Sequence, residues 1–250
     1  MKEILSEILK GKSTCIKNIN FLKTADYVQP FLDRLKDRKP EYIINVKLAD
    51  QMSLTEHQPD IIYNRVHIQA VLPDTILNNE FNRVMGMVYG LDTRKPVAKF
   101  YTGYVKDGKF YNFDATNIKS QMIENDSALD FDPISELLQT TDNNITMLTQ
   151  LKNTTYSTPN TLVENLGEWL DKSLSLSFPT DMGITKLSSA LVIDAYKNLV
   201  KDKDSTHYVG DKSQISFFQV YDTFADLIKN DKDIINTFEK TILVNKLLNL

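Results

Sequence analysis

The chain has 250 residues, of which 42% are hydrophobic and 25% are charged, and its formal net charge is −4. The composition is ordinary for a globular protein. The negative net charge excludes a general polyanion binder, so any contact with nucleic acid would need a local basic surface. The single cysteine, Cys15, excludes an intramolecular disulfide framework and indicates a reducing compartment. The length predicts one large domain or two small ones.

Two helices are predicted before the first strand. Apolar residues recur at helical spacing over residues 1–10 and again over residues 24–35. Lys39-Pro40 is expected to end the second helix, because proline cannot continue a hydrogen-bonded helical turn. Residues 42–46 then indicate a short apolar strand.

The longest predicted strand covers residues 60–72, where apolar and polar side chains alternate. His67 lies on its polar side, and we expect it to be solvated rather than a metal ligand. Pro73 is expected to end the strand, with residues 75–77 forming a turn of helix. Another strand is predicted at 83–91, and the short connections favour an antiparallel meander or a small barrel.

A predicted hairpin from Lys99 to Phe113 is the centre of the functional hypothesis. Asp107-Gly108 is a strong signal for a type I′ turn, in which both central residues have positive φ. Side chains alternate across a strand, so one face would carry several aromatic rings, with Lys106 directly opposite Lys109. Like charges in that position repel. The predicted nucleic-acid-binding residues are Phe100, Tyr104, Lys106, Lys109, Tyr111 and Phe113, together with Lys99, Arg94 and Lys95.

Single-stranded nucleic acid would account for the rings and the lysines together. Bases stack on aromatic rings while ammonium groups meet phosphates, and each stacked base contributes about 1–3 kcal/mol. Arg83 belongs to the same basic set, which is the densest in the predicted β region. The alternative is structural, because aromatic residues favour strands and one face of a hairpin must pack on a core.

After Asp114 the apolar pattern changes to helical spacing. The only tryptophan, Trp169, is expected in the core of this part. Acidic residues gather over 124–132, which we interpret as a solvated connector that ends with Asp132 as a helix cap. The predicted helices begin at Pro133 and then cover 144–151, 158–170, 185–200, 213–228 and 231–247.

No sequence motif assigns a reaction to the chain. The sequence lacks the paired histidines or cysteines of a metal site, the glycine-rich loop of a dinucleotide site and the serine elbow of a hydrolase. Gly11-Lys-Ser-Thr lacks the first glycine of a phosphate-binding loop and follows a predicted helix. We therefore predict a protein that is not an enzyme and has no metal site and no cofactor.

Three short segments suggest a family. They are Val88-Tyr-Gly-Leu-Asp, the strand and turn from Gly103-Tyr104 to Asp107-Gly108, and Phe217-Phe218-Gln-Val-Tyr221. Together they resemble small bacteriophage proteins of DNA metabolism, including phage single-stranded-DNA-binding proteins. The resemblance covers residues 84–116 and the last pair of helices, and it assigns no catalytic residue.

The predicted fold is α+β, with an antiparallel sheet or small barrel of about five strands and N-terminal helices in residues 1–116, and a helical lobe in 117–250. The predicted function is sequence-tolerant binding of single-stranded DNA in phage or mobile-element replication or recombination. The alternative is a non-enzymatic virion-assembly or protein-interaction protein, with the hairpin as a protein-binding surface.

The expected partner is single-stranded nucleic acid, and a homo-oligomer stays open. No membrane contact is expected, because no segment approaches the roughly 20 apolar residues that span a bilayer. No signal peptide is visible, so we expect the cytoplasm, which is that of the host cell if a phage encodes the chain.

Overall fold

The chain forms two compact units that interleave in the sequence. The computed structural model describes residues 2–13, 22–48, 62–92, 95–112, 117–122, 129–139, 141–156, 159–180, 183–200, 215–229 and 234–250. The first unit comprises Met1–Tyr104 and Thr116–Gln139, and the second comprises Val105–Ala115 and Thr140–Leu250. A division into independent domains at residues 116 and 117 stays a prediction.

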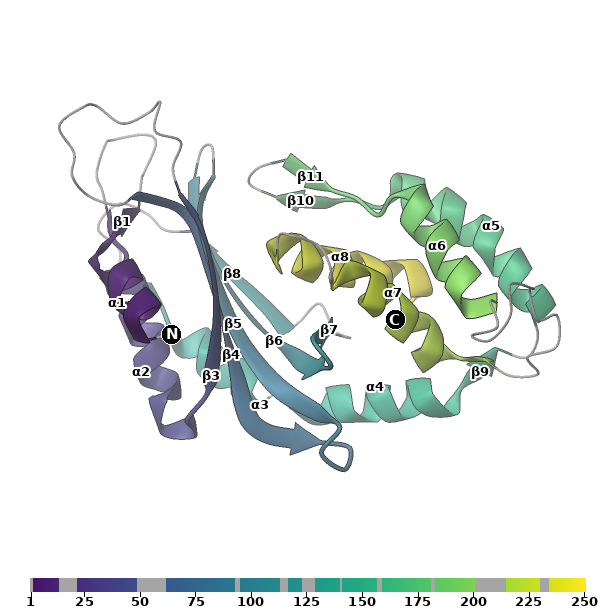
Figure 1. Cartoon of the computed structure of the whole chain (residues 1–250), viewed down its shortest axis with the longest axis horizontal. Coiled ribbons are helices and arrows are strands. Elements are labelled where there is room, and N and C mark those ends of the chain that lie inside the picture. Colours follow the sequence, from purple (N-terminus) through teal and green to yellow (C-terminus); the bar gives the residue numbers. More distant parts are fainter. Residues whose placement is uncertain are drawn as a thin grey trace. The chain divides into compact units, whose positions relative to one another are not determined.

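An open antiparallel sheet forms the centre of the first unit (Figure 1). Its main strands are β3 (Glu41–Leu48), β4 (Ile62–Ile76), β5 (Phe81–Asp92), β6 (Lys95–Lys106) and β8 (Ile118–Met122). They neighbour one another in this order, so the predicted α+β fold with an antiparallel sheet is confirmed. The barrel does not form, because the sheet is not closed. The short strand β1 (Lys12–Ser13) pairs in parallel with the start of β4, and β2 (Leu22–Lys23) pairs with β1.

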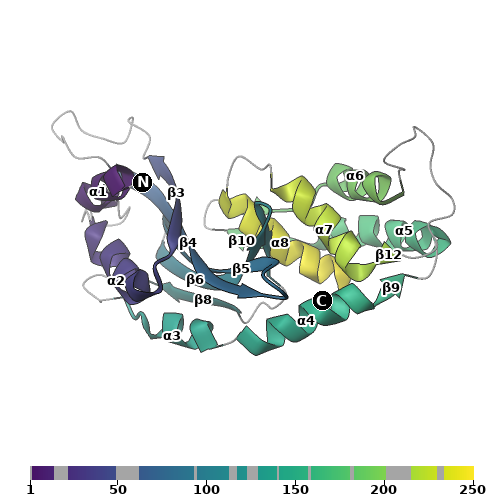
Figure 2. The ribbon, with the colours of Figure 1, turned by 60° about the horizontal axis from the view of Figure 1, so that its bottom comes forward.

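In the part of the first unit that the structure describes, three helices cover one face of this sheet. The views in Figures 1 and 2 agree that α1 (Lys2–Lys10) and α2 (Ala25–Leu35) lie against it, and α3 (Asp132–Gln139) contributes to the same core. A short 3₁₀ turn, Lys36–Arg38, follows α2. Alternation along the strands selects the apolar side chains that meet these helices. The buried cluster includes Ile8, Phe31, Ile68, Phe100 and Ile134.

Strand β4 continues through Pro73 to Ile76, so the predicted strand end at Pro73 is wrong. Pairing with β3 stops at Val71, and the register with β5 shifts between Val71 and Thr75. The missing N–H of proline therefore falls where the ladder is interrupted, which is where a strand tolerates it. The helical turn predicted for residues 75–77 is also wrong, because Thr75 and Ile76 pair with β5.

Among its described residues, the second unit is built mostly from five helices. They are α4 (Thr141–Asn153), α5 (Pro159–Ser175), α6 (Ser189–Val200), α7 (Phe217–Ile228) and α8 (Ile234–Leu248). Helix α7 contacts α4, α6 and α8, and it begins with a capping box in which Ser216 accepts from the backbone of Gln219. Trp169 is buried with its ring 6.1 Å from that of Phe224, which confirms its predicted core position.

Short strands complete the second unit. The strand β7 (Lys109–Tyr111) follows β6, while β9 (Thr155–Tyr156) pairs with β12 (Ile215–Ser216). Another antiparallel pair joins β10 (Phe178–Thr180) to β11 (Gly183–Thr185). The predicted helix at 185–200 therefore begins later than expected, because Thr185 belongs to β11 and α6 starts at Ser189.

Candidate functional site

The predicted hairpin turn is present between β6 and β7. Asp107 has φ of 51° and Gly108 has φ of 74°, so both central residues adopt the left-handed region that a type I′ turn requires. The backbone prediction is therefore confirmed. Whether this hairpin can bind a base depends on the contacts that its side chains make.

The rings of β6 are not exposed. Phe100 has no exposed area, and Tyr104 is 2% exposed. Phe100 belongs to the core under α1 and α2, with its ring centroid 6.5 Å from that of Phe31 and 5.6 Å from that of Phe131. The expectation that these two rings offer a free stacking surface is wrong, because Phe100 fills the core of the first unit and Tyr104 is almost completely buried.

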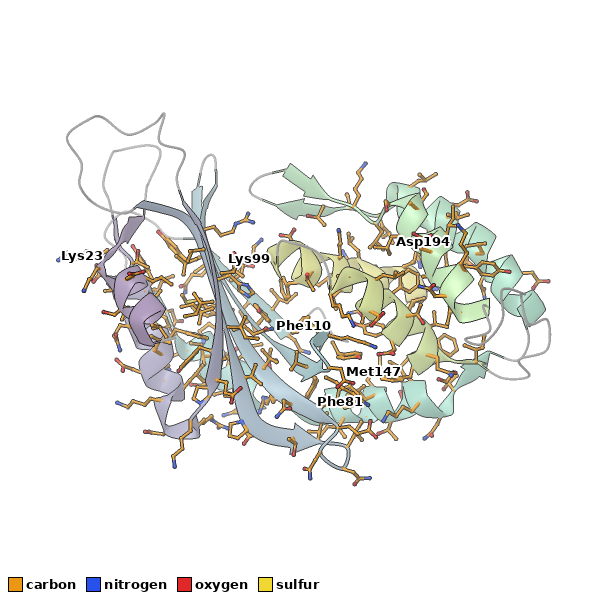
Figure 3. The ribbon with its side chains drawn as sticks, viewed as in Figure 1. Lys23, Phe81, Lys99, Phe110, Met147 and Asp194 are labelled. Carbon is orange, nitrogen blue, oxygen red and sulfur yellow. The ribbon has the colours of Figure 1, made fainter. Side chains whose placement is uncertain are left out.

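Tyr111 of β7 is also fully buried, within the second unit. Its ring stacks with those of Phe218 and Tyr221 of α7, at centroid distances of 6.1 and 5.9 Å. Its hydroxyl donates to Oδ1 of Asp222 over 2.5 Å. Burial, followed by this contact with a carboxylate, raises the pKa of Tyr111. The neighbouring ring of Phe110 (labelled in Figure 3) packs 6.0 Å from that of Phe238 on α8.

The ammonium group of Lys109 is paired with α7. Its Nζ donates to Asp222 and lies 2.9 Å from Oδ2, with Oδ1 of Asp226 at 3.4 Å. Partial burial disfavours the charge, but the bond to Asp222 and the two carboxylates outweigh it and raise the pKa of Lys109. The positive charge of Lys109, which lies opposite Lys106 across the turn, is therefore neutralised by carboxylates of α7.

The other predicted site residues do not assemble into a described basic surface. Lys106 and Lys99 are half-buried, and Lys99 is labelled in Figure 3. Lys95 begins β6, while Arg94 and Phe113 lie outside the described residues. Arg83 is 6% exposed and donates to the carbonyl oxygens of Leu137 and Leu138 over 2.9 and 2.6 Å, so it caps the end of α3.

A polar network crosses the sheet on the face opposite the helical core of the first unit. Tyr101 of β6 reaches over β5 to β4, where its hydroxyl lies 2.5 Å from Nε2 of His67 and also bonds to Gln69. Gly86 of β5 makes this crossing possible, because a Cβ built there would lie 1.9 Å from Cζ of the tyrosine ring. A glycine inside an otherwise apolar strand was the sequence signal for this close approach.

His67 is 1% exposed, so the expectation of a solvated histidine is wrong. Burial, and then the charge of Arg65, lower the pKa of His67 from 6.5 to about 3. The imidazole is therefore neutral at physiological pH, and its Nδ1 has no hydrogen-bond partner within the described part of the chain. The hydrogen bond between the neutral His67 ring and Tyr101 therefore links β4 to β6 across β5.

Strand β3 has exposed apolar side chains, in contrast to the described part of the hairpin. Ile43 is 41% exposed and Val46 is 36% exposed, and they point to opposite faces of the strand. Among the described residues of the first unit, these are the large hydrophobic side chains that remain exposed. Tyr42 and Ile44 between them are half-buried.

Strand β3 is also an edge strand. Within the described residues it pairs with β4 over Glu41–Leu48, and no strand is paired with its other side. An edge strand presents backbone N–H and C=O groups that can pair with another chain, and proteins usually protect such edges with charges, proline or bulges. Here Pro40 precedes the strand and a register shift follows Lys47, but residues 42–46 contain no charged side chain.

Neither a cluster of three metal-binding side chains nor a membrane-spanning helix is found in the part of the chain that the structure describes. Comparison with protein-family models, with curated proteins and with solved structures finds no match for this chain. The resemblance to phage DNA-metabolism proteins therefore stays a prediction.

Proposed function

We propose that this chain is a non-enzymatic interaction protein that binds a protein partner by adding a strand to the β3 edge. The observation that carries the proposal is that Ile43 and Val46, the exposed large apolar residues described in the first unit, lie in one strand that, within the described residues, is paired on one side alone, with β4. In strand addition, backbone hydrogen bonds supply affinity and alternate side chains supply specificity.

The two exposed residues suit such a partner because each lies on a different face of the strand. A single flat surface would cover Ile43 or Val46, whereas a strand paired alongside β3 would bring side chains against both. The half-buried Tyr42 and Ile44 would lose further exposed area on the core side.

Binding of single-stranded DNA at the hairpin has less support. A base needs a free ring face, and Phe100, Tyr104 and Tyr111 are at most 2% exposed. Lys109 already has two carboxylates, so a phosphate would compete with Asp222 and Asp226. Binding of a strand at β3 requires neither the exposure of a buried ring nor the loss of an ion pair.

The test uses a displayed library of short peptides, selected for binding to the full chain. Peptides with alternating apolar residues are expected, and their affinity should fall about tenfold or more for Ile43→Lys combined with Val46→Lys. Leu174→Lys is the matched control, because Leu174 is 69% exposed but lies on α5. Calorimetry measures the affinity, and hydrogen exchange should show added protection of β3 amides.

Two results would overturn the proposal. One is selected peptides that bind the lysine variants as tightly as the wild-type chain. The other is an absence of peptide binding together with quenching of Trp169 fluorescence by a single-stranded oligonucleotide that weakens steeply with salt, which would favour DNA binding.

A further inference from the structure

We infer that the strand that pairs with β3 is β3 of a second copy of the chain. This inference rests on the proposed function, because it names the partner of the same edge. A two-fold axis perpendicular to the sheet would place two β3 strands antiparallel, which joins the two sheets into one continuous sheet. Such an isologous contact is closed and stops at two copies.

The alternation of side chains restricts how two β3 strands can pair. Residues directly opposite each other in an antiparallel pair point to the same face, so a symmetric pair is centred on one residue that faces its own copy; near the middle of β3 this residue is Ile43, Ile44 or Asn45. Each choice brings a different set of residues together. The charges of the strand distinguish among the three.

The register centred on Ile44 is self-complementary. It places Glu41 opposite Lys47 twice, once at each end, and it places Tyr42 opposite Val46. Opposite charges across a strand pair are stabilising, and aromatic and β-branched residues form favourable pairs. Centring on Ile43 would put Glu41 opposite Asn45, and centring on Asn45 would put Lys47 opposite Ile43, so both lose the charge pairs.

The backbone of β3 is regular over all the residues that this register uses. The ladder with β4 is regular from Glu41 to Lys47, and the register shift comes only after Lys47. All seven residues that the register uses therefore lie in undistorted strand. Glu41 is exposed at the start of this segment.

A strand pair of this length buries less surface than a standard stable interface. We therefore expect a concentration-dependent dimer with a dissociation constant of roughly micromolar. Sedimentation equilibrium of the full chain over a range of concentrations measures it. Ile43→Lys with Val46→Lys should give a monomer, and Leu174→Lys should leave the dimer unchanged, with circular dichroism confirming that both variants are folded.

Charge exchange tests the register itself. Glu41→Lys alone and Lys47→Glu alone should each weaken the dimer about tenfold, because each puts like charges opposite each other at both ends. The double variant Glu41→Lys with Lys47→Glu should restore the wild-type dissociation constant. In a Cys15→Ser background, Ile44→Cys should form an intermolecular disulfide on oxidation, whereas Leu174→Cys should not, because opposed residues at the axis come within disulfide range.

The outcomes separate this inference from the proposed function. A monomer at all concentrations that still binds edge peptides would overturn the self-pairing and leave the proposed function intact. A dimer that persists in the lysine variants would overturn the self-pairing, because its interface would lie elsewhere. If the double charge exchange fails to restore the dimer, the register is overturned.

Discussion

The β6–β7 hairpin and strand β3 distribute their apolar side chains in opposite ways. The hairpin is rich in aromatic rings, and Phe100, Tyr104 and Tyr111 are at most 2% exposed, while its lysine Lys109 is paired with α7. Strand β3 has one aromatic residue, Tyr42, yet its Ile43 is 41% exposed. Composition therefore did not indicate which strand faces solvent; the helices that cover each strand decide it.

The largest loss of stability is expected from Tyr104→Ala combined with Tyr111→Ala, which removes two buried rings of the hairpin. Removing a buried aromatic side chain costs about 3–5 kcal/mol, so two such losses approach the whole stability of a domain, about 5–15 kcal/mol. We expect this variant to unfold or to lose most of its urea resistance, measured by circular dichroism.

The matched control is Ile43→Ala with Val46→Ala, which should change the free energy of unfolding by less than about 1 kcal/mol because both side chains are exposed. If the tyrosine variant instead keeps the wild-type urea midpoint, its rings are not core residues, and the hairpin regains its place as a base-stacking surface.

A smaller effect is expected from pH, through His67. Its pKa is about 3 in the folded chain against 6.5 when unfolded, so the unfolded state binds the proton more strongly. The stability due to the neutral imidazole is fully present above about pH 6.5 and falls as pH drops toward about 3, with a slope of at most about 1.4 kcal/mol per pH unit. Urea unfolding at about pH 7, 6 and 5 measures this slope.

His67→Gln supplies the comparison, because glutamine keeps a polar group near Tyr101 but does not titrate. This variant should show a flatter dependence of stability on pH in the same window. Equal slopes in the two proteins would show that His67 is accessible to protons and solvent in the folded chain, and would contradict its burial.

The smallest change in stability is expected when the charge of Lys109 is removed. Lys109→Met keeps the aliphatic stem and removes the charge that is paired with Asp222, so we expect a loss of about 1 kcal/mol in the free energy of unfolding. The loss should shrink in concentrated salt, which screens the pair.

Lys197→Met is the control for Lys109→Met. The Nζ of Lys197 lies 3.7 Å from Asp194, and both side chains are more than half exposed, so this change should have almost no effect on unfolding. A loss as large as that of Lys109→Met would mean that burial does not distinguish the two ion pairs.

Local signals predicted much of the backbone. The Asp107-Gly108 dipeptide fixed the hairpin turn, because positive φ at both residues is a local requirement. Alternation placed Val66 and Ile68 on one side of β4 and His67 on the other, as the structure shows. The strand end predicted at Pro73 was wrong because proline interrupts a strand only where a backbone N–H must donate to the neighbouring strand. The register shift beside Pro73 means that no such N–H is needed there.

Burial could not be predicted from the same signals. Whether Tyr111 stacks on a base or on α7 depends on Phe218, Tyr221 and Asp222, more than a hundred residues later in the chain. Likewise, His67 looked solvated because its strand alternates, but Tyr101 reaches it only because Gly86 leaves room. Such contacts between distant segments are set by tertiary packing, which no local pattern records.

The interleaving of the two units constrains how the molecule can be divided. Residues 105–115 belong to the helical unit but lie between two segments of the sheet unit, 1–104 and 116–139. A fragment that ends at residue 104 or at residue 115 therefore lacks residues 116–139 of the sheet unit. During synthesis β7 leaves the ribosome well before α7 and α8. The rings of Phe110 and Tyr111 therefore stay exposed until these C-terminal helices have been made and can pack on them.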